Sequence, residues 1–62
     1  MREFSAEEKR KVAEREVNQR KRVYERRIAD GKMSRQKAEY EIEAMQAIAN
    51  DYAEQAKKER LI

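Results

Sequence analysis

The chain has 62 residues, of which 47% are charged and 39% hydrophobic, and its formal net charge is +3. It contains no Cys and no His, which removes disulfides, the usual general base, the thiolate nucleophile and the soft-metal ligands. No apolar run is long enough for a membrane span or a signal peptide. We expect one domain over residues 1–62, residing in the cytoplasm, with no cofactor, metal, membrane contact or small-molecule substrate.

So high a charge content is also typical of disordered chains. Here the basic and acidic residues are nearly balanced, 16 against 13, and the apolar residues recur at regular intervals. Both features favour a folded chain.

Residues 29–34 divide the sequence into two halves. This stretch holds the only glycine, and the chain contains no proline. Gly31 can take the left-handed conformation that ends a helix, and Ser34 can cap the helix that follows. A loop this short folds the second helix back on the first. The prediction is an all-α antiparallel hairpin with helices at about 6–29 and 35–58.

The first helix has a capping box at its start, in which Ser5 and Glu8 exchange hydrogen bonds. Phe4 is expected to fold over this helix start. The apolar residues repeat every eleven positions, close to three full turns, and so share one face. Arg20 and Arg27 are expected to point toward the helix interface, with Glu16, Glu41 or Glu43 as ionic partners. The repeating sets are Ala6, Val17 and Ile28; Val12 and Val23; and Ala13 and Tyr24.

The second helix has a stricter pattern, with spacings of four and three that are typical of a bundle seam. Ile48 widens this seam. One hairpin would bury too little apolar surface to offset an ordering entropy of about 1.5 kcal/mol per residue. We therefore expect two hairpins to pair as a homodimeric four-helix bundle. The predicted dimer and core residues are Val17, Tyr24, Ile28, Ala38, Ile42, Met45, Ala49, Tyr52 and Ala56.

A weaker line of small residues follows Tyr40 at Ala44 and Ala47. Alanine is the best helix former, so helix propensity alone explains the pattern. The alternative is a second contact face for another chain.

Positive charge gathers on the first half of the chain. Residues 1–29 have ten Lys or Arg and six Asp or Glu, net +4, whereas residues 30–62 have six and seven, net −1. Lys11, Arg15, Arg22 and Arg26 fall on one outward line, and Arg15 and Arg22 have no acid four residues away. This line is a solvated face, a site for an acidic protein, or a site for nucleic acid. No aromatic residue is interleaved with these cations, which counts against nucleic acid.

Catalytic chemistry is not expected. The two serines, Ser5 and Ser34, are explained as helix caps, and Glu39 and Glu43 as a solvated face. A carboxylate-bridged metal bundle needs Glu-x-x-His motifs, which this chain cannot form.

Three runs together resemble a group of short helical proteins encoded by bacteriophages and prophages of proteobacteria. These runs are residues 20–26 (RKRVYER), 31–34 (GKMS) and 42–52 (IEAMQAIANDY). The resemblance covers about residues 10–55 and implies an accessory protein of phage type in a bacterial host, without chemistry of its own. In architecture the chain is also similar to the small RNA-binding hairpin that dimerises and regulates plasmid copy number.

The leading hypothesis is therefore a homodimeric bundle that binds a host protein. Nucleic-acid binding through the basic face is the alternative, and a structural phage component is the third.

Overall fold

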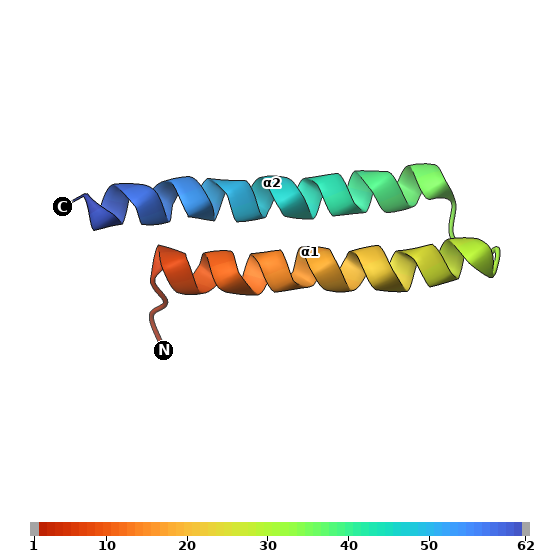
Figure 1. Cartoon of the computed structure of the whole chain (residues 1–62), viewed down its shortest axis with the longest axis horizontal. Helices are drawn as coiled ribbons and strands as arrows, with labels where there is room; N and C mark the ends of the chain where they lie inside the picture. Colours follow the sequence, from red (N-terminus) through yellow and green to blue (C-terminus); the bar gives the residue numbers. More distant parts are fainter. Residues whose placement is uncertain (1, 62) are drawn as a thin grey trace.

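The computed structural model describes residues 2–61 of the chain, which form two helices joined by a tight turn. Helix α1 runs over Ala6–Ala29 and helix α2 over Arg35–Arg60. The helices lie side by side and antiparallel, so that both chain ends are at one end of the hairpin (Figure 1). The predicted all-α hairpin is confirmed, with α2 ending two residues later than expected.

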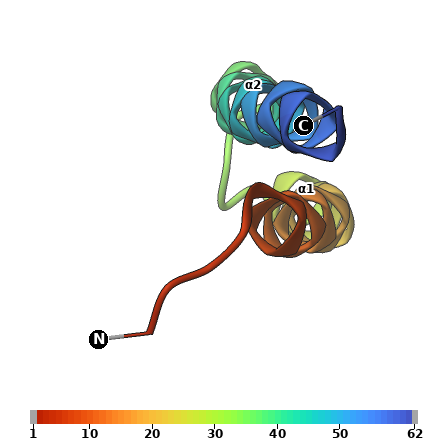
Figure 2. The ribbon, with the colours of Figure 1, turned by 90° about the vertical axis from the view of Figure 1, so that its left-hand side faces the viewer.

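The start of α1 has the predicted capping box. The backbone amide of Glu8 donates to the Ser5 hydroxyl at 3.1 Å, and the Ser5 amide donates to the Glu8 carboxylate at 3.0 Å. Residues 2–5 lead away from both helices (Figure 2). Phe4 itself is about half exposed and lines a pocket together with Glu8, Lys9 and Val12 of the first turns of α1.

The turn has the hydrogen bonds of a Schellman motif. Gly31 has a φ of +72°, its amide donates to Ile28 at 3.0 Å, and the Lys32 amide donates to Arg27 at 2.9 Å. Ser34 then caps α2 by accepting from the Lys37 amide at 3.1 Å. Both turn predictions are confirmed, and the turn directs α2 back along α1.

The core between the two helices is made of small side chains. Its fully buried members are each between 1% and 4% exposed, and none of the large apolar residues is among them. The predicted seam residues Ile42, Met45 and Tyr52 are only half buried, as are Tyr24 and Ile28 of α1. The buried set is Ala6, Ala13 and Val17 on α1 with Ala38, Ala49 and Ala56 on α2.

The apolar stripe of α1 is only partly covered, and the expectation for Arg27 is wrong. Val12 and Val23 are 48% and 44% exposed, because they lie about 100° around the helix from residues that face α2. One neighbouring helix cannot cover so wide a stripe. Arg20 is half buried and paired with Glu16 as predicted, but Arg27 is exposed and does not reach Glu41 or Glu43. Seven residues fall about 20° short of two turns, which moves Arg27 toward the flank.

The hairpin is a rod with a large surface. Its extents are 48 × 22 × 16 Å and its radius of gyration is 14.3 Å, against about 10.6 Å for a compact chain of this length. Its accessible surface is 5358 Å², whereas a folded monomer of this mass has about 4,200 Å². Each chain thus exposes about 1,100 Å² more than a compact fold would.

Candidate interaction surfaces

An apolar groove lies along one flank of the hairpin, in the half that contains the chain ends. Its volume is about 340 Å³. Val12 of α1 and Ile48 of α2 both line it, and both are almost half exposed. Lys9 lies on the rim, with its ammonium 5.4 Å from the centroid of the Tyr52 ring. The lining consists of Phe4, Glu8, Lys9, Val12, Ala13, Glu16, Met45, Ile48 and Tyr52.

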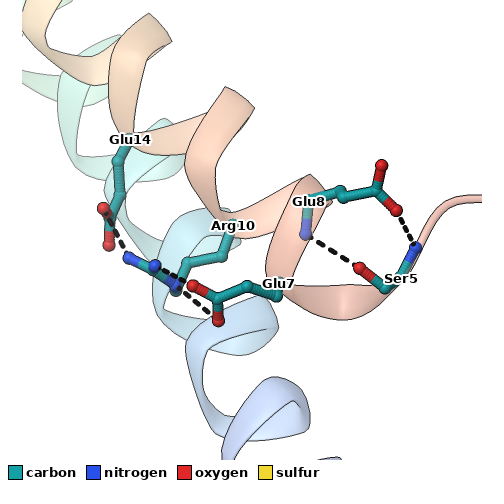
Figure 3. A network of polar contacts seen from close by, with 5 residues as sticks. All are labelled: Ser5, Glu7, Glu8, Arg10 and Glu14. Atoms are coloured by element: carbon teal, nitrogen blue, oxygen red, sulfur yellow. Dashed lines mark hydrogen bonds and ion pairs between the residues drawn. The ribbon is translucent and has the colours of Figure 1, made fainter.

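The other flank of α1 is polar. Arg10 bridges two carboxylates, donating to Glu7 and, at 2.8 Å, to Glu14 (Figure 3). The hydrogen bond from Arg10 lowers the pKa of Glu7, and the same pairing raises the pKa of Arg10. The bonds from Ser5 lower the pKa of Glu8. Val12 and this charged network lie on different sides of α1, so this half of the hairpin has one apolar and one polar flank.

Positive charge is concentrated at the turn end. Residues 20–37 have eight Lys or Arg and two Asp or Glu, net +6. Residues 1–19 have five of each, net zero, and residues 38–62 have three and six, net −3. Only one cross-hairpin ion pair occurs in this region of the described chain, between Arg35 and Glu25 at 3.5 Å. The rest of the turn end keeps a strong excess of cations.

Four of these cations line a cleft of about 470 Å³ beside the turn: Arg22, Arg26, Arg27 and Lys32. Val23 and Asp30 complete its lining. Over residues 2–61, none of the four forms an ion pair within 4.0 Å. We call this set the basic cleft. Its guanidinium groups are free to bind carboxylates or phosphates.

The structure divides the predicted basic line. Arg22 and Arg26 lie in the basic cleft, whereas Lys11 and Arg15 are exposed further along α1 toward the chain ends. Sequence reasoning missed Arg27, which it assigned to the interior, and Lys32, which lies in the turn. Counting the charges in successive segments of the sequence would have found both, because residues 20–37 have a net charge of +6.

The first turn of α2 adds two more cations. Arg35 and Lys37 stand there, and no acidic residue does. The helix dipole disfavours positive charge at an N-terminus. In α1, by contrast, Glu7 and Glu8 occupy the first turn and the basic residues the last.

The predicted second contact face is exposed. Tyr40 is 70% accessible, and Ala44 and Ala47 also face solvent on α2. None of the three lines the groove or either of the two clefts described for residues 2–61. This face is exposed to solvent.

Within the described part of the chain, no three acidic side chains gather closely enough to hold a metal ion. Neither α1 nor α2 has an apolar stretch that could cross a membrane. Comparisons with protein-family models, curated proteins and solved structures found no match to this chain. The proposals below rest on the two surfaces of the hairpin itself.

Proposed function

We propose that the protein is a non-enzymatic binding protein of phage type, active as a homodimeric four-helix bundle. Its basic turn end binds an acidic surface on a protein of the bacterial host. The observation that supports this most directly is the basic cleft, where four cations lie together with no ion-pair partner among residues 2–61.

The arrangement of charge in the hairpin has an energetic cost. The like charges of residues 20–37 repel one another, and Arg35 and Lys37 oppose the dipole of α2. Near the start of α1, by contrast, Arg10 is neutralised by ion pairs with Glu7 and Glu14. An acidic partner would offset this cost and would be steered toward the turn end over long range.

Nucleic acid is the second candidate, because the same guanidinium groups bind phosphates. The described surface around the cleft adds only Val23 to its charged residues, with no aromatic side chain on which a base could stack. A protein partner therefore fits the cleft better.

The test is affinity capture from host lysate, with and without nuclease, using the wild-type chain and two triple variants. Arg22→Ala, Arg26→Ala and Arg27→Ala together remove three charges from the cleft. The matched control is Lys57→Ala, Lys58→Ala and Arg60→Ala, which removes three charges from exposed positions at the far end of α2. Circular dichroism confirms that both variants fold.

We expect one protein to be captured by the wild type and by the control after nuclease treatment, and to be lost with the cleft variant. Capture that disappears with nuclease would favour nucleic acid instead. Equal capture by both triple variants would remove the cleft as the binding site.

A further inference from the structure

We propose that the apolar groove is closed by a second copy of the chain, paired through the halves that contain the chain ends. The two hairpins then lie antiparallel to each other, with their turn ends pointing in opposite directions. This inference rests on the homodimer of the proposed function and names the face and orientation of its interface.

The groove has the character of an interface core. Val12, Met45, Ile48 and Tyr52 are apolar, and all are only partly covered in the single hairpin. The residues buried between the two helices are alanines and one valine, so the large apolar side chains of the groove are less buried than the small side chains of the core. A second apolar surface laid over the groove would remove them from water.

The exposed area matches what a second copy would cover. Each chain exposes about 1,100 Å² beyond the surface of a compact monomer of its mass. A standard interface buries about 800 Å² on each partner. Pairing over half of the 48 Å rod supplies that area without unfolding either hairpin.

The charges at the rim of the groove favour a copy of the same chain. Glu8 and Glu16 lie beside the apolar residues on one helix, with Lys9 between them. A twofold axis applies every contact twice, so a surface with both charge signs can face itself with opposite charges aligned. A partner with a strong excess of one charge has no such match here.

The turn-end charge fixes the orientation. In a parallel pair, two regions of net +6 would lie side by side. In an antiparallel pair centred on Val12, the two α1 C-termini are separated by about 50 Å, since 17 residues rise about 25 Å from Val12 to Ala29. The two regions begin at Arg20, about 12 Å from Val12, so even their nearest ends are separated by about 24 Å. That is about three times the Debye length of about 8 Å at physiological salt, so their repulsion is largely screened.

Single-cysteine variants test the interface, because the natural chain has no cysteine to interfere. Val12→Cys and Ile48→Cys each place a thiol in the lining of the groove, one on each helix. Tyr40→Cys is the control, since it is exposed on another face of α2. With a short thiol cross-linker we expect covalent dimers from the two groove variants, at about ten times the yield of the control.

Ala29→Cys tests the orientation, since this residue is exposed and ends α1. Spin labels there should lie about 50 Å apart in the antiparallel pair. In a parallel pair their separation would be close to the 22 Å width of one hairpin.

Cross-linking confined to the groove variants, together with the long label distance, supports the inference. Equal cross-linking at position 40, or the short distance, overturns it even if sedimentation shows a dimer. A monomer in sedimentation overturns it as well. Capture of a host partner by the cleft is measured separately, so binding through the cleft can stand or fall on its own result.

Discussion

At the scale of single residues, Gly31 determines where α1 ends. Its φ of +72° costs an L-residue about 1–2 kcal/mol, and no atom lies within 4 Å of the place where a Cβ would stand. The cost of a side chain here is therefore backbone strain alone. We expect Gly31→Val to lower the free energy of unfolding by at least about 1 kcal/mol, measured by urea denaturation.

Asparagine provides the control for that prediction, because it tolerates the left-handed region better than other L-residues. Gly31→Asn should lose clearly less than Gly31→Val. Equal losses would mean that the volume of the side chain matters, against the open space observed.

The carboxylates at the start of α1 make stability depend on pH. Hydrogen bonds from Arg10 and Ser5 lower the pKa values of Glu7 and Glu8 in the folded chain. The unfolded chain therefore takes up protons first, so this stabilisation is present above the unfolded value of about 4.3 and is lost as the pH falls below it. Melting curves between pH 7 and 3 should show it.

In a variant with Glu7→Gln and Glu8→Gln, the melting temperature should fall less steeply as the pH is lowered in the same experiment. Glu39→Gln, at an exposed position on α2, is the control and should leave the slope unchanged. An unaltered slope in the double variant would contradict the assignment.

At the scale of the elements, the two helices differ in how they begin. α1 has a capping box and two acids in its first turn, while α2 has only the Ser34 cap and two cations. Lys37→Glu would complete a Ser-x-x-Glu capping box. It would also replace a positive charge that the dipole of α2 disfavours with a negative charge that it favours. We expect it to raise the free energy of unfolding by about 0.5–1 kcal/mol.

The matched control is Lys57→Glu, which makes the same change in the last turn of α2, where the dipole favours cations. Denaturation should show it to be destabilising. If Lys37→Glu also weakens partner capture, the cation at the start of α2 serves binding at the expense of stability.

The elements also show which features a sequence determines. Caps and turns depend on residues within a few positions of each other, so Ser5, Glu8, Gly31 and Ser34 were predicted correctly. The sides of each helix depend on what covers them. Val12 and Arg27 were misplaced because one neighbouring helix covers a narrower arc than the apolar stripe offers. The basic cleft combines Lys32 of the turn with α1 residues, a grouping that periodicity along one helix does not reveal.

At the scale of the whole molecule, we expect the alanine-rich core to make stability depend on the proposed pairing. If folding and dimerisation are coupled, a hundredfold rise in concentration adds about 2.7 kcal/mol. With an unfolding entropy of about 2.1 cal/mol/K per residue, summed over both chains of the dimer, the melting temperature should rise by about 10 °C. Thermal melts at 5 and 500 μM would measure it, and a constant melting temperature would contradict coupled folding.

Met45→Asp should greatly reduce this stability, because it places a carboxylate in the apolar groove. We expect dissociation or unfolding at micromolar concentration. Tyr40→Asp introduces the same group on the exposed face of α2 and should keep the wild-type behaviour.

The position of the turn also sets the order in which the hairpin assembles. Contacts between the helices span 10 residues for Glu25 and Arg35 but 53 for Ala6 and Glu59. Closing the longer loop first would cost about 1.5 kcal/mol more in chain entropy. Folding should start beside Gly31 and proceed toward the chain ends.

Ala38→Gly and Ala56→Gly change equally buried alanines at the two ends of α2. The first should slow refolding, and the second should mainly speed unfolding.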